Sequence, residues 1–268
     1  MKKLLSIIMS VSFVFNISVV SYARPKEVKT TNFVDILVSD EEVNIISEEN
    51  LETNKKYVYK IGDTIESAVV EVVDNGTKYT FEDINTGKKN EVLADLNGDL
   101  YIDGSILKIE DVELDNLSDD ILDNTNRRAV DNSWFFSKSP YVSGAYNSNS
   151  TTSYKSLTTD RTFANLTVSA MCMAIATVLS GGNVGVGITV GSSAFTGAEV
   201  IIKYYENNNP NAKQCWMKYI RTSNDRVDTN ADGTTYYYAF NNYYYSDSSR
   251  SNLISNDYSY AKLVRSYN

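Results

Sequence analysis

The stretch that decides the predicted fold is Phe163–Ile202, FANLTVSAMCMAIATVLSGGNVGVGITVGSSAFTGAEVII. Residues 163–179 carry no charge, residues 180–183 form a glycine-containing break, and residues 184–202 carry one charge, Glu199. Two apolar runs of helical length joined by a tight turn predict two helices, an αα-hairpin.

Small residues are dense in this hairpin. The glycines we single out are Gly181, Gly185, Gly187, Gly191 and Gly197. Two pairs have Gly-x-x-x-Gly spacing, which lets helix backbones approach closely, whereas each glycine costs a water-exposed helix about 1 kcal/mol relative to alanine. The hairpin is therefore either the buried core of a domain or a segment that inserts into a membrane and self-associates there.

Tyrosine dominates the sequence that follows the hairpin. Cys215–Arg221, Thr235–Tyr245 and Tyr258–Tyr267 predict three strands of an antiparallel sheet packed on the hairpin, because aromatic residues favour strands. The rings either form a surface for a membrane interface, a glycan or an envelope component, or fill the sheet. Cys172 and Cys215 predict a disulfide that ties the hairpin to the sheet, with two buried free thiols as the alternative.

Tight turns dominate the first half of the chain. Asn75-Gly76, Asn97-Gly98 and Asp103-Gly104 separate short runs rich in β-branched and aromatic residues. Asn-Gly and Asp-Gly tolerate the positive φ that two-residue hairpin turns require. The prediction for the whole chain is α+β, with an N-terminal antiparallel β-meander domain and a C-terminal apolar αα-hairpin packed with a Tyr-rich antiparallel sheet.

The N-terminus predicts the compartment. Lys2 and Lys3 precede an apolar run, and Ser21-Tyr22-Ala23 has the small-x-small pattern of a signal-peptidase site. We expect cleavage after Ala23 and a secreted, extracellular protein.

The charge of the chain changes at Arg127-Arg128. From Arg24 to Arg128 there are 25 acidic and 12 basic residues, and from Ala129 onward there are 9 and 11. Both Trp and 15 of the 20 Tyr also follow this point. The predicted parts are a signal peptide (1–23), an acidic β-rich pro-like domain (24–113), an acidic linker ending in the dibasic pair (114–128) and an aromatic-rich domain of helical hairpin plus strands (129–268). Because Arg127 and Arg128 end a polar linker, they are a candidate site for a processing protease, with two ordinary surface arginines as the alternative.

Several chemistries are excluded or unsupported. The chain has no His, which removes His-dependent catalytic triads and His zinc sites. The formal net charge of −9 argues against nucleic-acid binding. Asp228, Asn230 and Asp232 match the start of a calcium loop, but Ala239 stands where its bidentate Glu belongs, so a strand connection is the favoured interpretation. We expect no cofactor and no enzymatic activity.

The layout of signal peptide, acidic leader-like domain and small-residue hairpin with aromatic surroundings resembles the large secreted bacteriocins of Gram-positive bacteria, the geobacillin-type proteins in particular. This resemblance implies antibacterial activity by membrane disturbance and assigns no single residue. The leading hypothesis is a secreted, non-enzymatic, membrane-active antimicrobial or toxin-like precursor, activated by removal of the acidic half and directed at a bacterial membrane or envelope target. The alternative is a cell-surface or matrix binding protein whose Tyr-rich sheet contacts envelope glycan or protein.

Overall fold

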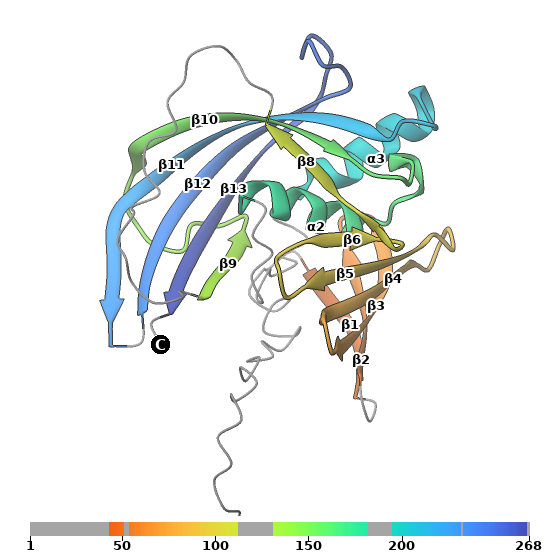
Figure 1. Cartoon of the computed structure of the whole chain (residues 1–268), viewed down its shortest axis with the longest axis horizontal. Helices are drawn as coiled ribbons and strands as arrows, with labels where there is room; N and C mark the ends of the chain where they lie inside the picture. Colours follow the sequence, from red (N-terminus) through yellow and green to blue (C-terminus); the bar gives the residue numbers. More distant parts are fainter. Residues whose placement is uncertain (1–42, 51–53, 112–130, 182–194, 232, 267–268) are drawn as a thin grey trace, which may run out of the picture.

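Two antiparallel sheets and the two helices between them make up the computed structural model (Figure 1). It describes residues 43–50, 54–111, 131–181, 195–231 and 233–266. A strongly curved sheet wraps over the helices, and a smaller sheet packs against them from the other side (Figure 1). Helix α2 (Val168–Leu179) contacts strands of both sheets, so the two halves of the sequence share one core.

The N-terminal sheet has its seven strands in chain order, each antiparallel to the next. They are β1 (Val43–Asn50), β2 (Asn54–Ile61), β3 (Thr64–Val73), β4 (Gly76–Asp83), β5 (Lys89–Asp95), β6 (Leu100–Ile102) and β7 (Ser105–Ile106). Turns at Asn75-Gly76 and Asp103-Gly104 join β3 to β4 and β6 to β7. This arrangement agrees with the meander that the turn residues predict.

The curved sheet has six strands in the order β8-β10-β11-β12-β13-β9. They are β8 (Lys108–Asp111), β9 (Asp131–Ser137), β10 (Tyr146–Thr158), β11 (Gln214–Asn230), β12 (Gly233–Tyr245) and β13 (Leu253–Ser266). The sequence predicted only the last three. Edge strand β8 comes from the acidic half and pairs with β10, where Ile109 lies opposite Leu157. A strand of the acidic half therefore completes the sheet of the aromatic half.

The predicted α+β class with a helical hairpin is wrong, because the structure is mostly β, with 60% strand and 15% helix. A short 3₁₀ turn, η1 (Phe163–Asn165), precedes α2, and Thr167 caps α2 by accepting a hydrogen bond from the Ala170 N–H at 3.2 Å. The second helix, α3 (Gly197–Asn208), begins well after the predicted start at residue 184. The sequence of α3 beyond Ile202 is polar, so this helix buries one face only. The apolar run of residues 184–202 therefore does not coincide with the helix.

Helix α2 is the centre of the core, and all twelve of its residues are buried. The curved sheet covers it with residues such as Met217 and Tyr244, and the N-terminal sheet covers it with residues such as Tyr57 and Phe81. Among the described residues, no helix combines the length and the apolar character needed to cross a membrane.

Candidate functional site

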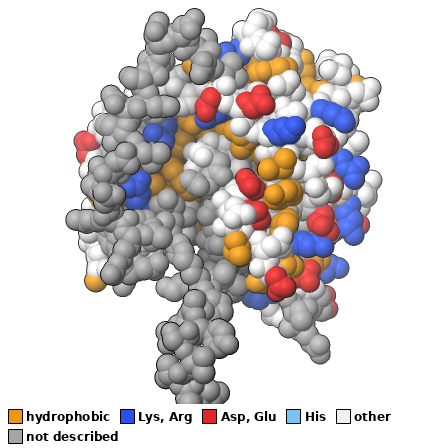
Figure 2. All heavy atoms as spheres, viewed as in Figure 1, with side chains coloured by type: hydrophobic (Ala, Val, Ile, Leu, Met, Phe, Trp, Pro, Cys, Tyr) orange, Lys and Arg blue, Asp and Glu red, His pale blue; other side chains and the backbone are white. Residues whose placement is uncertain are grey.

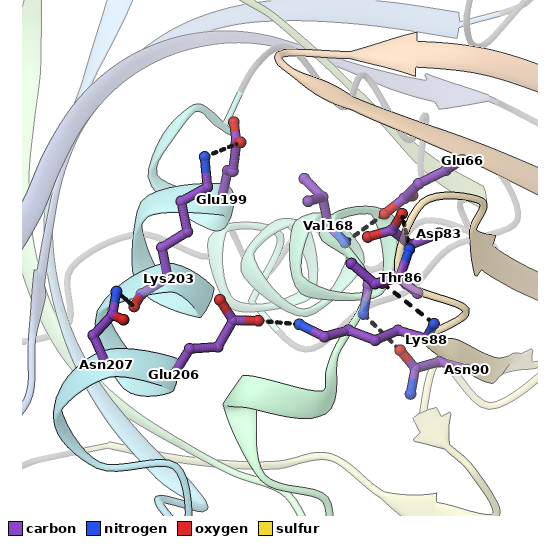
Figure 3. A network of polar contacts seen from close by, with 11 residues as sticks. Glu66, Asp83, Thr86, Lys88, Asn90, Val168, Glu199, Lys203, Glu206 and Asn207 are labelled. Atoms are coloured by element: carbon purple, nitrogen blue, oxygen red, sulfur yellow. Dashed lines mark hydrogen bonds and ion pairs between the residues drawn. The ribbon is translucent and has the colours of Figure 1, made fainter.

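A buried carboxylate of the acidic half binds the N-terminus of α2 (Figure 3). Glu66 lies on β3 and is 0% exposed. Its carboxylate accepts hydrogen bonds from the backbone N–H groups of Val168 at 2.6 Å and Ser169 at 3.1 Å. The first N–H groups of a helix have no partner within the helix, and they carry the positive end of its dipole. Glu66 therefore supplies both the acceptors and the charge that this helix end favours.

Two further side chains of the N-terminal sheet complete this contact. Asn90 of β5 accepts a hydrogen bond from the Thr167 N–H at 2.7 Å through its Oδ1 atom. The Tyr59 hydroxyl of β2 lies 2.6 Å from the Ser169 hydroxyl oxygen and donates to Glu66 at 3.4 Å. Three consecutive backbone N–H groups, those of residues 167–169, thus bond to side chains that lie 77 to 103 residues earlier in the chain. We call Tyr59, Glu66 and Asn90 the helix clamp.

Ion pairs surround the clamp at the surface. Lys88 pairs with Glu206 of α3, as Figure 3 shows, and Arg161 pairs with Asp103 at 2.9 Å. Asp103 also accepts a hydrogen bond from the Asn90 side chain at 3.0 Å, which links this ion pair to the clamp. Each pair joins the two halves of the chain, although ion pairs that stay partly exposed, as these do, contribute little on their own.

Burial sets the electrostatics of the clamp. Burial raises the pKa of Glu66, and the nearby Asp83 charge adds to the rise, while the hydrogen bonds from Ser169 and Val168 oppose it. Burial also raises the pKa of the Tyr59 hydroxyl well above its usual range, with the Glu66 charge as a second cause. The groups around Glu66 hold it in place and leave it enclosed, which suits a structural role better than a catalytic one.

A second buried carboxylate caps the other helix. Asp257 of β13 accepts a hydrogen bond from the Gly197 N–H at 3.0 Å, at the start of α3. Its carboxylate also accepts from the Asn242 side chain at 2.8 Å and the Tyr244 hydroxyl at 3.2 Å. A Cβ atom at position 197 would lie 2.5 Å from the Tyr244 ring, so only glycine fits this approach. Unlike the helix clamp, this cap lies wholly within the aromatic half.

The predicted glycines thus have separate roles. Gly181 ends α2 with a φ of +79°, a conformation that glycine adopts without strain, and its N–H bonds to the Val178 carbonyl at 3.1 Å. Gly197 allows the close approach of α3 to the curved sheet. Gly185, Gly187 and Gly191 lie outside the described residues.

The predicted disulfide is wrong, because the two buried cysteines are not joined by a disulfide. Cys172 lies within α2, where burial, then the charges of Glu66 and Asp257, raise its thiol pKa. The Cys215 thiol instead lies 3.6 Å from the Tyr245 carbonyl oxygen, and burial raises its pKa to about 12. The alternative prediction, two buried thiols, matches the structure.

The weak calcium motif lies at a strand connection. Asn230 accepts a hydrogen bond from the Gly233 N–H at 2.9 Å, which closes the turn between β11 and β12. Asp228 is engaged by Arg226 at 2.9 Å and by the Tyr237 hydroxyl at 2.6 Å, and Asp232 lies outside the described residues. No cluster of three or more potential metal ligands occurs in the described part of the chain.

The tyrosines divide between the two faces of the curved sheet. Tyr219 and Tyr244 point into the core, which matches the alternative prediction that the rings fill the sheet. On the opposite, convex face, the Lys218 ammonium lies 5.9 Å from the Tyr154 ring centroid and 5.5 Å from that of Tyr243. The Arg250 guanidinium lies 4.5 Å from the same Tyr154 ring. These four residues form a cation–π cluster that is half-buried and reachable by solvent.

Sequence reasoning missed the helix clamp. A signal was present, because Glu66 has the same strand phase as the buried Ala68 and interrupts an apolar run of β-branched residues. A charge on the core face of a strand requires a partner, and here the partner is a helix end.

The predicted processing residues Ala23, Arg127 and Arg128 lie outside the described residues. No protein-family model, no curated protein and no solved structure matches this chain.

Proposed function

We propose that this protein is a secreted, non-enzymatic precursor of a membrane-active antimicrobial or toxin-like protein, and that its acidic half masks helix α2. Cutting the connection near Arg127-Arg128, followed by loss of the acidic half, uncovers the apolar surface of α2. That surface then acts at a bacterial membrane.

The observation that carries the proposal is the helix clamp. Glu66 is fully buried, and its carboxylate accepts hydrogen bonds from the N-terminus of α2, a helix whose residues are all buried. Residues of the N-terminal sheet such as Phe81 and Ile102 belong to the same core as α2. Because exposed apolar surface is unfavourable in water by about 25 cal/mol per Å², loss of this sheet drives α2 towards another apolar partner, and a bilayer offers one.

The distribution of charge supports the same proposal. The half that covers α2 is strongly acidic, whereas the half that contains α2 carries 11 basic against 9 acidic residues. Removal of the acidic half therefore leaves a part that an anionic membrane attracts more readily than it attracts the whole chain.

The test uses the full chain with a site for a specific protease in place of Arg127-Arg128. The two halves share one core and are joined by the β8–β10 pairing and the clamp, so we expect them to co-elute after the cut. Dye release from anionic liposomes is measured before the cut, after it, and after the cut in a Glu66→Ala variant, which loosens the clamp. We expect release to be lowest for intact protein and highest for cut E66A.

Glu82→Ala is the matched control, because Glu82 is exposed on the neighbouring strand β4. Cut E82A should behave like cut wild type. If no form releases dye, although size exclusion shows that the halves have separated, the proposal is wrong.

The cation–π cluster on the convex face favours a second candidate function, a surface protein that binds envelope glycan. Tyr154, Lys218, Tyr243 and Arg250 present aromatic faces next to cations, a combination that suits sugar rings bearing anionic groups. Binding of the uncut chain to purified cell-wall polysaccharide, lost in Tyr243→Ala, would favour this candidate.

A further inference from the structure

A second set of arginines and aromatic rings lies on the concave face of the curved sheet. The Arg221 guanidinium of β11 lies 5.4 Å from the Tyr238 ring centroid, and that of Arg265 of β13 lies 5.1 Å from the Tyr236 ring centroid. Trp134 of β9 packs on Tyr238 with ring centroids 5.5 Å apart. We call these five residues the arginine–tyrosine site.

The strand register places these side chains on one face. Arg221 pairs with the buried Phe240, and Tyr236 pairs with the buried Leu263, which in turn pairs with Trp134. Residues that face one another across antiparallel strands point to the same side of the sheet. The site is therefore an extension of the core face, beyond the part that α2 and α3 cover.

The two arginines differ from others in the chain. Arg161 and Arg226 pair with carboxylates, whereas the side chains of Arg221 and Arg265, like that of Arg250, make no ion pair and no hydrogen bond among the residues that the structure describes. The Arg265 Nε atom is buried without an acceptor. A guanidinium group with a buried nitrogen that lacks an acceptor is costly, so an incoming anion that accepts from the terminal nitrogens of the same group is favoured.

Both positive charges act on the same ring. Burial raises the pKa of Tyr238, and the charges of Arg221 and Arg265 both oppose that rise. Tyr236 and Tyr238 are two residues apart on β12 and therefore on the same face, so the two guanidiniums lie over neighbouring rings of one strand. A phosphate suits this arrangement, because it offers several oxygens and each guanidinium donates through a rigid planar fork.

The site is open to solvent in the uncut chain. The two arginines and two tyrosines are half-buried, and only Trp134 is buried. The ends of β11, β12 and β13 lie away from the N-terminal sheet (Figure 1). Figure 2 shows hydrophobic side chains next to Lys and Arg below the curved sheet.

We propose that the arginine–tyrosine site binds the phosphate head group of an anionic lipid. Arg221 and Arg265 hold the phosphate oxygens, and the rings of Tyr236 and Tyr238 contact the glycerol and the first methylene groups. The choice of a lipid rests on the proposed membrane activity, and it names the membrane component that the protein contacts first.

The experiment measures binding of the full, uncut chain to vesicles by co-sedimentation, with phosphatidylglycerol vesicles against phosphatidylcholine vesicles. Arg221→Gln and Arg265→Gln each remove one cation, and we expect each to weaken binding to phosphatidylglycerol on the order of tenfold. The double Arg→Lys variant keeps the charge but loses the fork, so we expect an intermediate loss. Thermal unfolding of each variant shows that it still folds.

Arg226→Gln is the matched control, because Arg226 is an exposed arginine of the same strand, already paired with Asp228. It should bind like wild type. Equal loss in R226Q, or equal binding of wild type to both vesicles, would overturn the site. Binding of inorganic phosphate without any vesicle binding would overturn the lipid assignment. None of these outcomes depends on dye release after cutting, so the site and the proposed function fail separately.

Discussion

Truncation of Glu66 to alanine tests the helix clamp most directly. The change leaves the N–H groups of Val168 and Ser169, bonded at 2.6 and 3.1 Å in the wild type, without an acceptor in a fully buried place. An unsatisfied buried donor costs about 1–3 kcal/mol, and loss of the buried charge offsets part of the sum. We therefore expect Glu66→Ala to lower the free energy of unfolding by about 2–4 kcal/mol.

Urea denaturation of the full chain at neutral pH measures this change. Glu66→Gln should cost less, because the amide oxygen still accepts one hydrogen bond while its NH₂ group faces the other N–H. The exposed Glu82→Ala should stay within about 0.5 kcal/mol of wild type. A loss below about 0.5 kcal/mol for E66A would refute the reasoning, since the clamp would then contribute no more than a surface residue.

The pH dependence gives an independent check. Because burial raises the pKa of Glu66, the folded protein binds this proton more tightly than the unfolded chain does. Its contribution to stability is therefore fully present below the unfolded pKa and is lost as the pH rises through the folded pKa. Relative to E66Q, wild type should be more stable at about pH 4 than at about pH 7. Subtracting the variant cancels Asp257, whose pKa burial also raises.

Three further changes have defined outcomes. Gly197→Ala should lower the free energy of unfolding by about 1–3 kcal/mol in urea melts, because the new Cβ would lie 2.5 Å from a buried ring. Cys172 and Cys215 should react with a thiol reagent only after unfolding, since both are buried and their thiol pKa values are raised; fast reaction of the folded chain would contradict this. Ile109→Asp should speed hydrogen exchange of the backbone N–H groups around Leu157, where β8 pairs with β10. The same change at the exposed Ile106 of β7 should leave that exchange unchanged. Equal exchange in the two variants would count against the pairing.

The N-terminal sheet was the part of the fold most open to prediction. Its strands follow one another through turns such as Asn75-Gly76, so short-range signals suffice to order them. The curved sheet was harder. Strands β8 and β10 pair Ile109 with Leu157, a long-range contact that local sequence patterns do not encode. The Ser/Thr/Asn composition of β10 also hides its strand character behind residues typical of loops.

The prediction of a helical hairpin from the two apolar runs was wrong for a physical reason. Apolar content reports burial, and it does not by itself report helix. Helix α2 begins at Val168 because Thr167 caps it, and α3 begins at Gly197, where Asp257 accepts the first N–H and Tyr244 leaves no room for a side chain. The start of α3 thus depends on partners distant in the sequence, so periodicity alone could not find it.

The two capping carboxylates explain how the halves of the chain are coupled. Asp257 caps α3 from within the aromatic half, so that cap survives loss of the acidic half. Glu66 caps α2 from the acidic half, so the same loss leaves α2 with only its own Thr167 cap and an uncovered apolar face. Helix α2, whose residues are all buried, is thus the helix that loses both the Glu66 cap and its apolar cover when the acidic half leaves. A mutation at Glu66 should therefore affect the exposure of α2, whereas one at Asp257 should affect the fold of the aromatic half with or without its acidic partner.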